Sequence, residues 1–210
     1  MLSTLLALVT SQPAAMSCGD GVEVCGVLTV MTGLGAGVQN VSGGAVYGHP
    51  TAIVHGLWPQ VPPYGKSRCV APSWRANATY VFPCYICARG DDNCSSTPGH
   101  SPLQFEAHEW SKHGVCAGVQ DSTDYFSQVC GLALRPVELV GTMRAAGERN
   151  LTAFATRLEA ADPAYEVHFA DESTMELQLS ACREESSGEW RLAPVHRFAE
   201  ECGGRRIRVW

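Results

Sequence analysis

The chain has 210 residues, ten cysteines and a formal charge of −6 at pH 7 with its histidines neutral. This length fits one domain with a sizeable core, and no apolar run is long enough to span a membrane. The cysteine content indicates an oxidising compartment, and the acidic balance excludes the basic footprint that nucleic-acid-binding proteins ordinarily show at neutral pH.

The N-terminal segment, residues 1–17, has some features of a signal peptide. Leu5 to Val9 is apolar, and Ala15-Met16-Ser17 is an acceptable cleavage site. The apolar run is short, however, and no Lys or Arg precedes it. A signal peptide is therefore one interpretation of this segment, and a strand is the other.

A strand is predicted where the apolar run Ala52 to Val54 leads into His55. Gly56 and Pro59 should then break the strand, so that His55 lies at its end. Residues 33–48, which are rich in glycine, and residues 61–78 are predicted to form the loops on either side.

The next segment, residues 82–101, combines cysteines with a histidine: Cys84, Cys87, Cys94 and His100. These residue types could ligate zinc. Because other cysteines surround them in a chain of this composition, disulfides are the better interpretation.

The stretch Gln104–Cys116 predicts a helix with one chemically rich face. At 100° per residue, four side chains share that face: His108, Glu109, Lys112 and His113. Gly114 suits the left-handed conformation that ends many helices. Two histidines, a carboxylate and a lysine on one arc indicate half of an active site rather than a plain solvated surface.

A zinc protease is the alternative for a His-Glu pair on a helix, and it needs a second histidine four residues after the first. That position is Lys112, whose ammonium would oppose a dication. We therefore predict neither a metal nor another cofactor at this site.

The remainder of the chain shows helical spacing followed by strand alternation. Helices are predicted from Ser122 to a stop at Arg135-Pro136, over Val137–Arg144 and over Thr152–Ala160, and strands over residues 167–169, 175–179, 190–192 and 207–209. Strands and helices occur in blocks without βαβ alternation. The predicted fold class is therefore α+β, a single domain with a mainly antiparallel sheet packed against helices.

All four asparagines stand in Asn-x-Ser/Thr triplets, which are acceptors for N-glycosylation. This pattern favours a eukaryotic glycoprotein of the secretory pathway. The predicted glycosylation sites are Asn40, Asn77 and Asn150. Asn93 is set aside because a disulfide at Cys94, inside its triplet, would prevent modification.

Two motifs carry a resemblance to a known family. HGLWPQ at residues 55–60 and FEAHEWSKHGVC at residues 105–116 resemble the two active-site segments of the T2-type ribonucleases, a family of acid endoribonucleases that includes secreted and vacuolar enzymes. The resemblance implies one ribonuclease T2-like domain over residues 1–210, in a secreted or vacuolar/lysosomal protein. It also favours Leu5–Thr10 as the first strand rather than as part of a signal peptide.

The resemblance implies a role for each polar residue of the motifs. His113 is similar to the family's general base and His55 to its general acid, whereas spacing alone does not decide which histidine does which. His108, Glu109 and Lys112 are similar to the residues that bind the phosphate. The expected reaction cleaves single-stranded RNA through a 2′,3′-cyclic phosphate to a 3′-phosphate, and DNA, which lacks the 2′-hydroxyl, should not react.

The resemblance also implies base-binding residues and disulfides. Trp58 and Phe105 match positions that stack on bases, and Gln60 occupies a position that is acidic in some members. The implied disulfides are Cys18–Cys25, Cys69–Cys116 and Cys182–Cys202. Cys84, Cys87, Cys94 and Cys130 remain as two pairs whose partners the sequence does not assign.

The acidic charge leads to an expectation about pH. Protonation of all seven histidines would change the formal charge from −6 to +1, which favours activity on a polyanion at acid pH. We expect a monomer with no membrane partner. The alternative is a secreted, disulfide-rich binding protein that keeps the fold without turnover.

Overall fold

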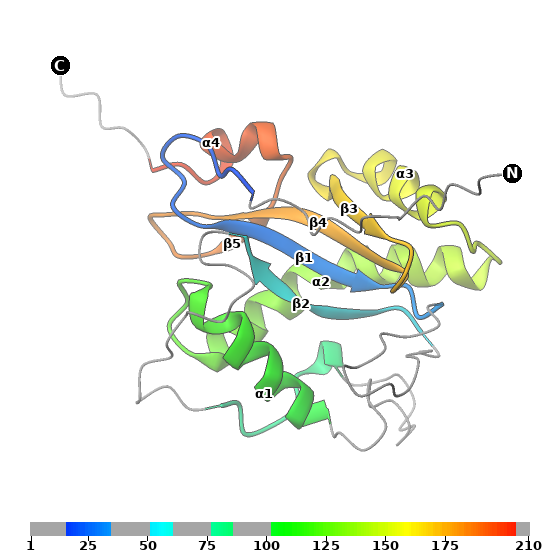
Figure 1. The fold of residues 1–210 in the computed structure, drawn as a ribbon, viewed down its shortest axis with the longest axis horizontal. Helices are drawn as coiled ribbons and strands as arrows, with labels where there is room; N and C mark the ends of the chain where they lie inside the picture. The colour runs from blue at the N-terminus through cyan, green and yellow to red at the C-terminus, as the bar shows by residue number, and fades with distance from the viewer. Residues whose placement is uncertain (1–15, 35–50, 61–76, 86–101, 205–210) are drawn as a thin grey trace, which may run out of the picture.

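The computed structural model describes residues 16–34, 51–60, 77–85 and 102–204. They form the predicted α+β fold, with an antiparallel sheet and helices packed against it (Figure 1). The described strands are β1 (Cys25–Met31), β2 (Ile53–Pro59), β3 (Val167–Asp171), β4 (Glu176–Arg183) and β5 (Trp190–Leu192).

The sheet has the order β2-β1-β4-β3, and β5 pairs with β4 beyond the end of β3. The sequence predicted β3 and β4 from their alternation and β5 as a short strand, but β1 was not among the predicted strands. All seven residues of β1 are buried, so it shows no alternation of polar and apolar side chains. The strands predicted at Leu5–Thr10 and Ile207–Val209 lie outside the described residues.

The described α-helices are α1 (Pro102–Lys112), α2 (Ser122–Ala145), α3 (Leu151–Ala161) and α4 (Phe198–Glu201). Short 3-10 turns stand at Pro83–Tyr85, Gly114–Cys116, Pro163–Tyr165 and Val195–Arg197. Within the described parts of the chain, none of these helices combines the length and apolarity needed to cross a membrane.

The prediction that a helix stops at Arg135-Pro136 was wrong, because α2 runs through Pro136 as one helix. A proline inside a helix removes a hydrogen bond and costs about 3 kcal/mol, which is why the rule places a stop there. Here the inward-facing positions keep one helical period on both sides of the proline, and all of them are buried: Val129, Ala133, Pro136, Val140 and Met143. Packing of this continuous stripe outweighs the local preference.

The main core lies between the sheet and the helices α2 and α3. Leu28, Leu57 and Leu179 are fully buried on the face that these helices cover. Neighbouring residues of a strand point to opposite faces, and Val27 accordingly belongs to a second, smaller core that includes Phe198 of α4. The sheet is thus buried on both faces, with the larger core on the α2 side.

Strand β2 differs from its prediction. The structure continues the strand through Gly56 to Pro59, so Gly56 does not break it. Thr29 of β1 pairs with Gly56 while the next residue, Val30, pairs with Val54, which makes His55 the extra residue of a β-bulge. A bulge bends a strand and redirects a side chain, and here the redirected side chain is the first histidine of the motifs.

Gly114 does not adopt the predicted left-handed conformation, and it begins a 3-10 turn after α1 instead. Glycine is needed at this position for a reason other than its backbone conformation. A Cβ at this position would lie 2.3 Å from Cε3 of Trp110, whose ring is buried in the main core. Close packing, rather than the backbone angle, requires glycine here.

Two of the implied disulfides are confirmed, namely Cys18–Cys25 and Cys182–Cys202. A third, Cys84–Cys130, joins the segment before α1 to α2 and resolves one of the pairs that the sequence left open. Cys84 is therefore a disulfide cysteine rather than a zinc ligand. Cys116 is also disulfide-bonded, and since Cys69 lies outside the described residues, that pairing stays a prediction.

Two of the predicted glycosylation sites lie in the described residues. Asn77 and Asn150 are both exposed. The Asn150 side chain also caps α3, because its Oδ1 accepts a hydrogen bond from the N–H of Ala153 at 3.0 Å. Asn40 lies outside the described residues, and occupancy at all three sites stays a prediction.

Candidate functional site

His55 is held at the β2 bulge by contacts to both of its ring nitrogens. Nδ1 lies 2.7 Å from Oε1 of Glu176, and Nε2 lies 3.5 Å from Oε1 of Glu109. The backbone carbonyl of His55 accepts a hydrogen bond from the Tyr85 hydroxyl at 3.1 Å. The imidazole retains 18% of its side-chain exposure, so it is fixed in place but still reachable from solvent.

Glu109 brings α1 into contact with β2. Its side chain is 1% exposed, and Oε2 accepts a hydrogen bond from the indole N–H of Trp58 at 2.8 Å. The carboxylate passes directly over Gly56, where a Cβ would lie 2.1 Å from Oε2. The glycine of the HGLWPQ motif thus makes room for the glutamate of the second motif.

His113 enters the site from the end of α1. Its ring stacks on Trp58 with centroids 5.1 Å apart and planes 27° apart, while His55 meets the edge of the same indole at 4.8 Å. Trp58 therefore lies between the two histidines. The electrostatic influence of His108 and Lys112 reaches His113, and both of these side chains are exposed. The structure brings all five predicted catalytic residues to one place.

The two histidines have opposite protonation preferences. Burial disfavours the His55 imidazolium, but the carboxylates of Glu176 and Glu109 outweigh burial and raise its pKa to about 9. Burial, together with the positive charges of His55, His108 and Lys112, lowers the pKa of His113 to about 3. Between these two values His55 is cationic and His113 is neutral.

The carboxyl group of Glu109 is also perturbed. Burial raises its pKa to about 6, although the nearby His55 and the hydrogen bond from Trp58 oppose the rise. Glu109 therefore changes charge in mildly acidic solution, whereas the two histidines do not.

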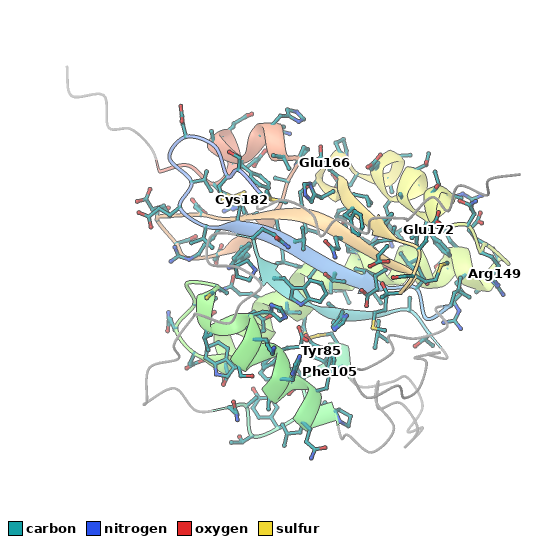
Figure 2. All side chains as sticks on the ribbon, in the orientation of Figure 1. Tyr85, Phe105, Arg149, Glu166, Glu172 and Cys182 are labelled. Atoms are coloured by element: carbon teal, nitrogen blue, oxygen red, sulfur yellow. A yellow bond between two sulfur atoms is a disulfide. The ribbon has the colours of Figure 1, made fainter. Side chains whose placement is uncertain are left out.

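The predicted base-binding residues have different surroundings. Phe105 is half-buried on α1, and its ring lies 5.3 Å from that of His55 and 5.9 Å from that of Tyr85, which Figure 2 labels beside it. Trp58 is also half-buried, and the stacked His113 covers one of its faces. Gln60 is only 4% exposed, so its side chain would have to move to reach a base. These three roles stay predictions.

No sequence pattern indicated Glu176 or Tyr85 as members of the site. Glu176 is 121 positions from His55, and it opens a strand whose apolar residues were its only recognisable feature. Tyr85 follows a cysteine in a segment interpreted only through its disulfides. Within the described residues no group of three or more His, Cys, Asp or Glu side chains converges as a metal site would require.

Comparison with known proteins gives a family match and a distant relative. Residues 47–150 match the model of the ribonuclease T2 family, a span that contains both motifs. The protein named Ribonuclease 3 of Arabidopsis thaliana is 32% identical over 83 residues, which are 39% of this chain. That alignment covers 36% of the relative, so the chain matches little more than a third of its length. No solved structure matches the chain.

Proposed function

We propose, from the premise that this chain belongs to the ribonuclease T2 family, that it is an endoribonuclease that cleaves single-stranded RNA by proton transfer between two histidines, without a metal. The observation that carries this proposal is the opposite pKa shift of the two histidines at one site. Catalytic acids and bases are recognised by environments that push their pKa values apart.

The protonation states support one choice of the roles that spacing left open. A general base must begin the reaction without a proton, and His113, with a pKa of about 3, is neutral in mildly acidic solution. A general acid must begin with a proton, and His55, with a pKa of about 9, carries one. His113 is therefore the proposed base and His55 the proposed acid, which agrees with the family resemblance.

The proposed first step is an internal transesterification. His113 removes the proton from a ribose 2′-hydroxyl, whose oxygen attacks the adjacent phosphorus. The bond from phosphorus to the 5′-oxygen breaks, and His55 gives its Nε2 proton to that oxygen. The products are a 2′,3′-cyclic phosphate and a free 5′-hydroxyl, and DNA is inert because it has no 2′-hydroxyl.

The proposed second step reverses the two roles. Neutral His55 takes a proton from water, which attacks the cyclic phosphate, and the imidazolium of His113 returns a proton to the 2′-oxygen. The result is a 3′-phosphate, with both histidines back in their initial states. Each positioned proton transfer contributes typically 10²–10⁴-fold to the rate.

Phosphate binding is proposed for the exposed face of α1. Lys112 and His108 are exposed beside His113, and a lysine ammonium supplies positive charge to an equatorial phosphate oxygen. Below its pKa of about 6 the carboxyl group of Glu109 is neutral, so it no longer repels a phosphate bound beside His113. This change favours activity in acid.

The expected pH profile is bell-shaped and lies on the acid side. Protonation of His113 stops the reaction near its pKa of about 3, and ionisation of Glu109 above about 6 weakens phosphate binding. Cleavage at pH 8 that equals or exceeds cleavage at pH 5 would contradict this proposal. Such an optimum, the disulfides and the glycosylation triplets suit a secreted or vacuolar/lysosomal protein.

The test is release of acid-soluble nucleotides from RNA at pH 5 with EDTA present. The parent protein should cleave, and His113→Ala and His55→Ala should each lose about 10²–10⁴-fold. His168→Ala is the matched control, because His168 is exposed on β3 away from the site. A correctly disulfide-bonded parent that is inert with and without added zinc would instead favour the binding-protein alternative.

A further inference from the structure

We propose that Glu176 is a positioning residue for the reaction: its carboxylate holds Nδ1 of His55 so that Nε2 is the nitrogen that delivers the proton. This inference rests on the proposed function, because it assigns Glu176 to the general acid of that mechanism. Neither motif contains Glu176, which reaches the site from β4 on the other side of β1.

The contact between the two side chains is short and largely shielded from water. Nδ1 of His55 lies 2.7 Å from Oε1 of Glu176, and the side chain of Glu176 is 4% exposed. Its second oxygen, Oε2, accepts a hydrogen bond from the Thr174 hydroxyl at 3.0 Å. Both carboxylate oxygens are therefore engaged, which fixes the direction in which Glu176 presents Oε1.

The backbone before Glu176 is held in an unusual conformation. Met175 has a φ of +55°, and within the described residues it is the one residue other than glycine with a positive φ. Such a conformation costs of order 1 kcal/mol and persists where surrounding contacts fix it. Here the carbonyl of Met175 accepts hydrogen bonds from the backbone N–H and the hydroxyl of Thr32, at 3.1 and 2.9 Å. The strained residue places Glu176 at the start of β4.

The groups that face His55 come from several elements. Glu176 faces Nδ1 from β4, Glu109 faces Nε2 from α1, and the rings of Trp58 and Phe105 lie against the imidazole. His113 contributes electrostatically, and the Tyr85 hydroxyl binds the backbone carbonyl of His55. Glu176 is the group in hydrogen-bond contact with the ring, at a nitrogen that the reaction does not use.

The proton balance follows from this arrangement. Before cleavage the imidazolium has hydrogens on both nitrogens, and Nδ1–H donates to Glu176. When Nε2 gives its hydrogen to the departing 5′-oxygen, Nδ1–H stays with Glu176, so the neutral ring already has the tautomer in which Nε2 can accept a proton from water. Glu176 thus serves both steps without exchanging a proton itself.

The first experiment follows His55 without RNA, by nitrogen-15 NMR titration of its ring. The matched variants are Glu176→Gln and Glu172→Gln. Glu172 is exposed in the turn between β3 and β4 (Figure 2), so its variant removes the same charge away from His55. We expect the pKa of His55 to fall by about 1–3 units in Glu176→Gln and to stay near 9 in Glu172→Gln.

The parent protein gives a second readout that needs no substitution. Above its pKa, neutral His55 should carry its hydrogen on Nδ1. A hydrogen on Nε2 instead, or a titration of His55 unchanged by Glu176→Gln, would overturn the proposal.

The second experiment compares kcat across pH. Glu176→Gln should match the parent within a few-fold at pH 5, where His55 stays protonated in both, and should fall below it at pH 8 by about twofold for a pKa lowered by one unit and about ninetyfold for one lowered by three. An equal loss at every pH would mean that Glu176 only supports the fold, and would reject the positioning role. If the parent cleaves no RNA, the proposed function fails, while the NMR titration still decides whether Glu176 controls His55.

Discussion

At Gly56 the backbone of β2 lies directly against the Glu109 side chain of α1. The carboxylate of Glu109 occupies the space that a side chain at Gly56 would need, and the same carboxylate binds the indole of Trp58. One missing methyl group therefore lets two separate motifs assemble.

Replacing Gly56 with alanine should disrupt the site directly. The new Cβ would lie 2.1 Å from Oε2 of Glu109 and 2.8 Å from Nε1 of Trp58, so one of these groups must move. We expect a loss of about 1–3 kcal/mol in stability, measured by urea unfolding, and a fall in RNA cleavage larger than that loss explains. A variant with parent-like activity would refute this account.

Gly131→Ala is the control for that substitution. Gly131 lies exposed inside α2, and a Cβ there would meet nothing within 4 Å. Because alanine is the better helix former, this variant should gain about 1 kcal/mol and keep its activity.

At the residue scale, the two motifs were sufficient to predict His55, His108, Glu109, Lys112 and His113 as neighbours. Their spacing placed four of them on one face of a predicted helix; α1 contains His108, Glu109 and Lys112, and His113 follows directly after its end. Glu176 could not be predicted in this way, because strand pairing through β1 brings it to His55 and no local pattern records such a pairing.

At the scale of helices and strands, the predictions were right where the spacing of apolar residues alone determines the element. The helix predicted over Thr152–Ala160 is present as α3, and its Phe154 and Leu158, spaced one turn apart, are both fully buried. The helix stop at Pro136 failed because the rule considers the backbone alone, whereas packing against the sheet holds α2 together. The bulge at His55 is likewise a property of two paired strands rather than of one sequence segment.

The start of α3 offers a test at this scale, because Asn150 is both a helix cap and a glycosylation acceptor. Asn150→Ala should lose about 1 kcal/mol of stability in unglycosylated protein, since the N–H of Ala153 loses its acceptor. Asn150→Asp should retain that stability. Urea unfolding of protein from a host that does not glycosylate would measure both.

Thr152→Ala separates the two roles of Asn150. This change removes the acceptor triplet while leaving the cap intact, so it should abolish any glycan without the loss seen in Asn150→Ala. A stability loss as large as that of Asn150→Ala would mean that the cap is not the cause.

At the scale of the whole molecule, stability depends on pH through its buried groups. Glu106 on α1 is fully buried, and Oε1 accepts a hydrogen bond from the N–H of Phe82 at 2.7 Å. Burial raises its pKa to about 7, although that hydrogen bond opposes the rise. The folded protein therefore binds this proton more tightly than the unfolded chain does.

Because folding raises the pKa of Glu106, the free energy of unfolding falls as the pH rises and this group ionises. The stabilising contribution of protonated Glu106 is fully present below pH 4.5 and is lost as the pH rises through about 7. This loss is on the order of 3 kcal/mol. Glu106→Gln should remove it, so the variant should lose less stability than the parent between pH 4.5 and pH 8 in urea unfolding. Parallel curves for the two proteins would contradict this assignment.

As the pH falls, the net charge of the molecule does not change in the way that protonation of all seven histidines would give. His55 is already charged at pH 7 and His113 stays neutral at pH 5, so neither contributes to the change between those values. Glu106 and Glu109, with pKa values of about 7 and 6, become protonated and lose their negative charges as the pH falls from 7 to 5. Protonation of two carboxyl groups buried on α1 thus accounts for part of the charge change that the sequence analysis attributed to histidines alone.

The hydrogen bonds along β2 have a consequence for association of the protein in acid. Among the described strands β2 lies at one edge of the sheet, and tyrosine hydroxyls bind three of its backbone groups: Tyr125 binds both the N–H and the carbonyl of Leu57, and Tyr85 binds the carbonyl of His55. An open strand edge invites pairing with a neighbouring molecule, and the danger grows as net charge approaches zero. In acid, where protonation of the histidines moves the formal charge of −6 towards zero, we expect the two tyrosine hydroxyls to hinder pairing of β2 with a neighbouring molecule.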